Sequence, residues 1–183
     1  EIPQTDLLAL TVIRGVDRRL SVYVAPRRDV LSNRVQWKRL VHLDDDIRSL
    51  SFGFGYVWAL SARGAPTHKL IAMPMSTLMS NVEPKLAGNS ANESVGDASQ
   101  TTARWVTVLE ASDAVIRAVD ISKDALYITR RRGVNTELLR ARVETQKDSS
   151  NVTDIHTVPR LSLEVIKTPR EGNITTNASD DQT

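Results

Sequence analysis

The chain has 183 residues, a formal net charge of +2 and no cysteine. This length suits one domain of ordinary size, and the composition excludes disulfides, thiolate zinc sites and a cysteine nucleophile. The weak positive charge gives no argument for nucleic acid as a partner. No apolar run approaches the length of a membrane span, and the start of the chain lacks the basic residues of a signal peptide.

The first predicted unit, residues 1–43, holds three short strands of alternating character. They lie at Leu7–Ile13, Leu20–Ala25 and Gln36–Val41, and an Arg-Gly turn separates the first two. Glycine supplies the positive φ that such a tight turn needs. The following unit has four strands in the same arrangement, so we interpret this unit as one without its first strand.

The second unit, residues 44–110, contains the full set. Its four predicted strands are Ile47–Phe52, Val57–Ala62, His68–Met73 and Trp105–Leu109. A polar insert at residues 76–103 separates the last two strands. Because this insert is rich in Ser, Asn, Ala and Gly, we expect a disordered loop.

The third unit, residues 111–168, repeats the pattern with strands at Val115–Ile121, Leu126–Arg131, Glu137–Val143 and Leu161–Lys167. The remaining residues, 169–183, hold a candidate first strand of a further unit at Asn173–Ala178. No stretch of the chain predicts a convincing amphipathic helix.

Spacing shows that a whole unit recurs. Trp37 and Trp105 are 68 residues apart, and Gly64 and Gly133 are 69 apart. Without the polar run Ser76–Thr102 the period falls to about 42 residues, which is typical of a β-propeller with four strands per blade. We therefore predict an all-β fold of four-stranded antiparallel blades forming an incomplete ring.

Strand direction predicts which turns lie together. Successive strands of a blade run in opposite directions, so the turn between the second and third strands and the link to the next blade share one end. The polar insert then lies at the other end.

The run "WKRLVHLDDDIRSLSFGFGYVWALSARGAPTHKLIAMPM" resembles the propeller of the prolyl oligopeptidase family of serine peptidases, and "EASDAVIRAVDISKDALYITRRRGVNTELLR" resembles its following blade. The resemblance implies a parent with a seven-bladed propeller and an α/β-hydrolase domain that holds a Ser/Asp/His triad. This chain would supply about three blades. Oligopeptidase B, a relative with similar blades, fits the same patterns.

The resemblance also implies a site. In that family the hairpin matching "RGVD" borders the substrate cavity, so Val16 would line an outer subsite with Arg14 nearby. The best-known members carry a cysteine where this chain has Val16, which argues against a thiol or polar role. The alternative is an ordinary exposed turn.

The catalytic motif of a serine hydrolase is absent from the sequence. No Gly-x-Ser-x-Gly elbow is present, and His42, His68 and His156 stand singly, without metal-ligand spacing. Asp44–Asp46 reads as a solvated turn rather than a cation site, and Arg130–Arg132 as a blade edge rather than a phosphate site.

We therefore expect a non-catalytic segment without metal or cofactor, which gates the access of short peptides to a hydrolase domain of the same parent chain. Nucleic acid and membrane are not expected partners, and the protein would be soluble, in the cytoplasm or the periplasm. The alternative is a propeller that serves as a protein-binding module without catalytic activity.

Overall fold

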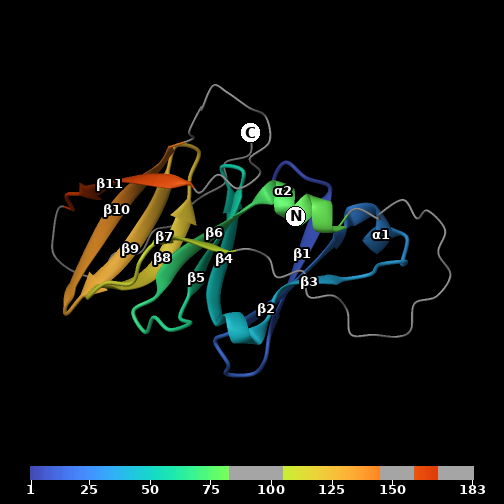
Figure 1. Cartoon of the computed structure of the whole chain (residues 1–183), viewed down its shortest axis with the longest axis horizontal. Coiled ribbons are helices and arrows are strands. Elements are labelled where there is room, and N and C mark those ends of the chain that lie inside the picture. The colour runs from blue at the N-terminus through green and yellow to red at the C-terminus, as the bar shows by residue number, and fades with distance from the viewer. Residues whose placement is uncertain (83–104, 145–158, 169–183) are drawn as a thin grey trace.

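The computed structural model describes residues 1–82, 105–144 and 159–168, which form three antiparallel sheets side by side in chain order (Figure 1). We call them the first blade (β1-β2-β3), the second blade (β4-β5-β6-β7) and the third blade (β8-β9-β10-β11). Neighbouring strands pair antiparallel throughout. The predicted all-β architecture of four-stranded propeller blades is confirmed.

The strands follow the predicted positions closely. In the first blade they are β1 (Leu7–Ile13), β2 (Leu20–Pro26) and β3 (Lys38–Val41). In the second blade they are β4 (Ile47–Gly53), β5 (Tyr56–Ser61), β6 (Lys69–Pro74) and β7 (Val106–Leu109). In the third blade they are β8 (Val115–Ile121), β9 (Leu126–Arg132), β10 (Asn135–Glu144) and β11 (Arg160–Ile166).

The core lies between the blades, and β5 is at its centre because all six of its residues are buried. Successive side chains of a strand point to opposite faces. Val57 and Ala59 therefore pack toward the first blade, while Trp58 and Leu60 pack toward the third. Burial of each large aliphatic side chain contributes roughly 1.5–3 kcal/mol, so this double burial fixes the second blade between its neighbours.

Two clusters of buried side chains fill these interfaces. Between the first and second blades lie Ile2, Leu7, Val22, Val24, Leu40, Val41, Ile47, Val57, Ala59, Ile71, Met73 and Leu78. Between the second and third blades lie Tyr56, Trp58, Leu60, Leu70, Ala72, Ile116, Val119, Leu126, Ile128, Leu139 and Ala141.

The hairpin between the second and third strand positions turns on a glycine in every blade. Gly15, Gly64 and Gly133 have φ values of 57°, 63° and 60°, which confirms the predicted positive φ at the Arg-Gly turns. These three turns lie at one end of the molecule, at the bottom of Figure 1.

At the opposite end β4 lies close to β8. A Cβ atom added to Gly53 would stand 2.8 Å from Cγ2 and 3.2 Å from Cδ1 of Ile121. The Trp58 indole N–H also donates to the Gly53 carbonyl at 2.9 Å. The absence of a side chain at Gly53 therefore allows the close approach of the two strands.

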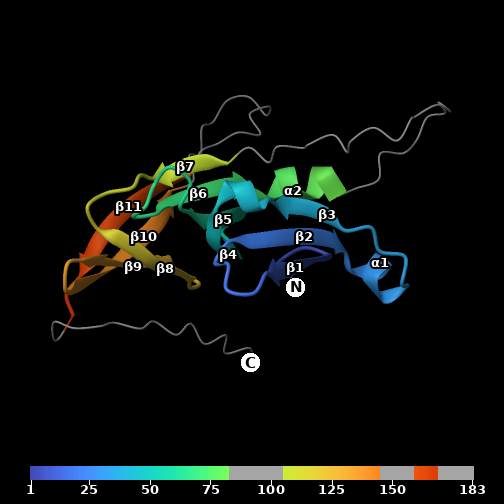
Figure 2. The same cartoon turned by 90° about the horizontal axis from the view of Figure 1, so that it is seen from below.

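The prediction of no helix was wrong at two places. Arg27–Leu31 forms a short helix, α1, and Met75–Val82 forms a second, α2, within the first part of the expected loop. α2 continues from β6 and lies beside the first blade (Figure 2). Leu78 is buried in the cluster between the first two blades, which gives the helix an anchor. The rest of the insert and the expected strand Asn173–Ala178 lie outside the described residues.

Candidate functional site

The β1–β2 turn presents an apolar tip to solvent. Ile13 pairs with Leu20, so six residues form the loop, and the Asp17 amide donates to the Arg14 carbonyl at 3.0 Å. Val16 is fully exposed at the tip. Ile13, at the base of the turn, is also 62% exposed, so two large aliphatic side chains face solvent here, which makes the turn a candidate contact surface.

An ion pair fixes the shape of this loop. Arg19 Nε lies 3.0 Å from both carboxylate oxygens of Asp17, Arg19 Nη2 lies 2.7 Å from Oδ2, and the Arg19 amide donates to Oδ1 at 2.9 Å. These hydrogen bonds lower the pKa of Asp17 from 3.8 to about 2, with a smaller contribution from the positive charge of Arg48. The Asp17 carboxylate therefore accepts its hydrogen bonds from a residue of its own turn.

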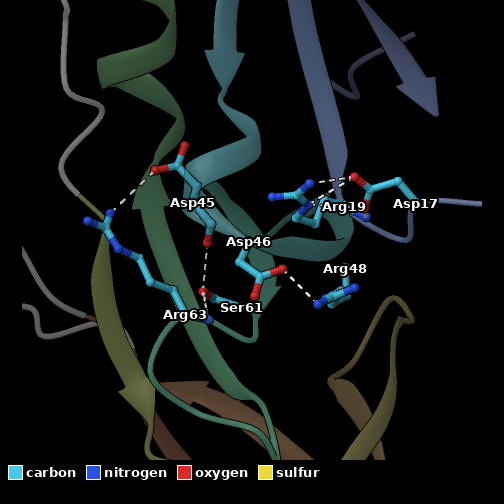
Figure 3. A network of polar contacts seen from close by, with 7 residues as sticks. All are labelled: Asp17, Arg19, Asp45, Asp46, Arg48, Ser61 and Arg63. Atoms are coloured by element: carbon cyan, nitrogen blue, oxygen red, sulfur yellow. Dashed lines mark hydrogen bonds and ion pairs between the residues drawn. The ribbon is translucent and has the colours of Figure 1, made fainter. Parts of the chain in front are cut away.

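The link between the first and second blades is held by polar contacts (Figure 3). Asp45 accepts the His42 amide at 2.8 Å and lies 3.8 Å from Arg63, while its carbonyl accepts the Ser61 hydroxyl at 2.9 Å. Asp46 lies 2.8 Å from Arg48. Asp45 and Asp46 are therefore held by contacts within this turn. That the run is a turn rather than a cation site stays a prediction.

The arginine run is also structural. Arg130 pairs with Glu137 at 2.7 Å, Arg132 pairs with Asp113 at 3.0 Å, and Arg131 Nε donates to the Gly133 carbonyl. The Arg132–Asp113 pair joins the β9–β10 hairpin to the start of the third blade, and the other two contacts lie within the hairpin. Phosphate or nucleic acid is not needed to explain them.

An open pocket of about 640 Å³ lies beside the β1–β2 turn, where all three blades meet. It is lined by Ile13, Gly15, Val16, Asp17, Arg18, Leu20, Arg48, His68 and Arg117. The turn of the first blade thus shares one end of the molecule with the starts of β4 and β8, as the strand directions predicted.

Two β-bulges lie at the pocket. The register of β4 against β5 shifts between Ile47 and Ser49, and that of β8 against β9 shifts between Ile116 and Ala118. The residue inside each shift, Arg48 or Arg117, lines the pocket. Bulges commonly re-aim a side chain in this way.

His68, which lines the pocket, joins the second blade to the third. Its Nδ1 lies 2.7 Å from the Ile116 carbonyl, and the Ile116 amide donates to the Thr67 carbonyl at 3.0 Å. Since a carbonyl only accepts, Nδ1 carries the hydrogen. The φ of His68 is 66°, a left-handed conformation that these two contacts hold in place.

Of the two predicted site residues, only Val16 lines the pocket; Arg14 is exposed on the same turn. The sequence analysis missed Arg48 and Arg117. Arg48 and Arg117 are 69 residues apart, as are Gly64 and Gly133, so an alignment of the two repeats would have identified them as equivalent positions. His42 begins the acidic turn, and His156 lies outside the described residues.

Within residues 1–82, 105–144 and 159–168, no three His, Asp or Glu side chains lie close enough together to hold a metal ion. No helix in this part of the chain is long and apolar enough to cross a bilayer.

No family model matches the chain, and no curated protein matches it in sequence. A solved chain from a structural and mechanistic analysis of two prolyl endopeptidases is similar in fold, with a TM-score of 0.57 and 17% sequence identity. The match covers 93% of this chain and 19% of that one. At this identity the likeness shows a shared fold, and this chain spans about a fifth of the other protein's length.

Proposed function

We propose that the chain belongs to the non-catalytic propeller of a prolyl-oligopeptidase-like serine peptidase. The observation that carries the proposal is the fold likeness to a prolyl endopeptidase over 93% of the chain. The blade patterns in the sequence support the same family independently. The comparison adds no support for oligopeptidase B.

In this proposal the β1–β2 turn limits the access of short peptides to an α/β-hydrolase domain of the parent protein. Val16 is fully exposed at the tip of the turn and lines an open pocket. This supports such a role, because substrate cavities are lined mostly by apolar side chains and Val16 is not buried inside its own blade. Arg14, exposed on the same turn, would border the cavity.

The experiment uses the full parent protein. A serine-directed fluorophosphonate should label it, and Val16→Trp should lower kcat/KM about tenfold for a four-residue proline peptide, which corresponds to about 1.4 kcal/mol, with a smaller effect on a two-residue one. The larger side chain would obstruct the longer substrate. Kinetics with both peptides, beside a denaturant midpoint, measures this.

Val134→Trp is the matched control, because Val134 follows Gly133 in the corresponding turn of the third blade, is 80% exposed and does not line the pocket. Equal effects of Val16→Trp on both peptides, or equal effects of the two variants, would exclude gating by Val16. A parent protein that no fluorophosphonate labels would instead favour the protein-binding module.

A further inference from the structure

Arg48 and Arg117 occupy the same place in successive blades. Each follows an isoleucine near the start of the first strand of its blade, in "DIRSL" and "VIRAV", and each sits in a β-bulge. Both line the pocket at the β1–β2 turn. An arginine therefore recurs at the same β-bulge in two successive blades, and both arginines bring positive charge to the pocket.

The two arginines differ in how they are neutralised. Asp46 lies 2.8 Å from Arg48 Nη2 but without hydrogen-bond geometry, and the buried Arg48 Nε has no hydrogen-bond partner. The position that corresponds to Asp46 in the third blade is Val115. Arg117 is exposed and forms no ion pair with the described residues.

The remaining charges leave the pocket positive. Arg18 adds a third cation to the lining, while the one lining carboxylate, Asp17, is already bound by Arg19. His68 adds no carboxylate to the lining, and its Nδ1 is already engaged by the Ile116 carbonyl. The pocket therefore offers guanidinium donors to an anion.

Part of the lining is apolar. It includes Ile13, Val16 and Leu20, and Ile13 is 62% exposed. A ligand that matches this mixed lining carries a negative group next to an apolar one. Asp17 and Asp46 lie close by, so a singly charged carboxylate is repelled less than a doubly charged phosphate.

We propose that this pocket binds the carboxylate of a peptide through Arg117 and Arg48, with an apolar side chain of the peptide against Ile13, Val16 and Leu20. The choice of a carboxylate follows from the charges of the pocket, whereas the choice of a peptide rests on the proposed function. The carboxylate can belong to the C-terminus or to an acidic side chain.

Calorimetric titration of this chain tests the inference with an acetylated tetrapeptide that ends in leucine. The free acid should bind, its C-terminal amide should bind about tenfold more weakly, and affinity should fall as NaCl rises from about 50 to 200 mM. Arg117→Gln should weaken binding of the free acid about tenfold, and Arg117→Lys should weaken it less because the charge remains.

Arg142→Gln is the matched control: Arg142 is an exposed arginine of β10 that does not line the pocket, and its removal should leave the affinity unchanged. Thermal melting of each variant shows that it is folded. An amidated peptide with one internal glutamate that binds as tightly as the free acid would assign the carboxylate to a side chain and support the site.

Equal binding of acid and amide would overturn the inference, as would an affinity insensitive to Arg117→Gln. Inorganic phosphate that binds as tightly as the peptide would show a general anion site and overturn the peptide assignment. If fluorophosphonate labels the parent protein but the peptide does not bind to this pocket, the anion-site inference is wrong and the proposed peptidase function stands. If the peptide binds to this pocket but fluorophosphonate does not label the parent protein, the proposed peptidase function is wrong and the binding site stands.

Discussion

Asp17 and Arg19 stand two residues apart in the β1–β2 turn, and their contact controls how that turn responds to acid. An unfolded aspartate has a pKa of about 3.9, whereas the hydrogen bonds from Arg19 hold the pKa of Asp17 at about 2. Because the folded pKa is the lower one, the pair stabilises the fold fully above about pH 4, and this contribution is lost as the pH falls toward 2.

Arg19→Gln should therefore return the pKa of Asp17 toward the ordinary range. A carboxyl NMR titration of the folded chain measures it directly, and Asp17 should still be ionised at about pH 3 in the unmodified protein. Arg18→Gln is the control, since Arg18 makes no hydrogen bond to Asp17. A pKa of Asp17 that is the same in all three proteins would show that the pair does not form in solution.

Among the elements, the approach of β4 to β8 depends on one missing side chain. The φ of Gly53 is not positive, so the glycine is required for space rather than for backbone conformation. Gly53→Ala would place Cβ 2.8 Å from Ile121 Cγ2, which should cost about 1–3 kcal/mol of unfolding free energy.

Two substitutions of Ile121 separate the steric cause from a general loss of packing. Ile121→Ala removes Cγ2, so the double variant with Gly53→Ala should be less destabilised than the sum of the singles. Ile121→Val retains Cγ2 and removes only Cδ1, the more distant contact at 3.2 Å, so it should give less relief. Denaturant midpoints of the five variants provide the test, and strict additivity with Ile121→Ala would contradict the close contact.

The strands could be predicted because alternation and Arg-Gly turns are local signals. α2 could not, because only the buried Leu78 and the partly buried Met75 anchor its described part, and Ser76 and Thr77 already have the polar composition of the insert. The site was predictable in part. The resemblance selected the turn at Val16, but alternation within one strand does not reveal a bulge, so Arg48 and Arg117 emerge only when two blades are compared.

Across the whole molecule, protection from hydrogen exchange should follow the position of each strand. β5 is buried on both faces and paired on both edges, whereas β1 pairs only with β2 among the described strands and β11 only with β10. Amides of β5 and β6 should exchange slowest, and those of β1 and β11 fastest, because these two edge strands also have many exposed side chains and open with less loss of packing.

Mass-spectrometric exchange on the chain measures this order. Val57→Ala leaves a cavity in the interface with the first blade, and Ile128→Ala leaves one in the interface with the third. Val57→Ala should raise exchange mainly in the first blade, and Ile128→Ala mainly in the third. Uniform exchange over all three blades would contradict the arrangement.

The double burial of β5 has a consequence for the unfolded chain. The segment Tyr56–Ser61, "YVWALS", carries no charge and no proline, since neither of its faces meets water in the folded protein. When the blades separate, it becomes an uncharged strand-forming segment that can pair with its copy in another molecule. Refolding therefore competes with aggregation, and the same residues that hold the blades together set the concentration at which the protein can be recovered from denaturant.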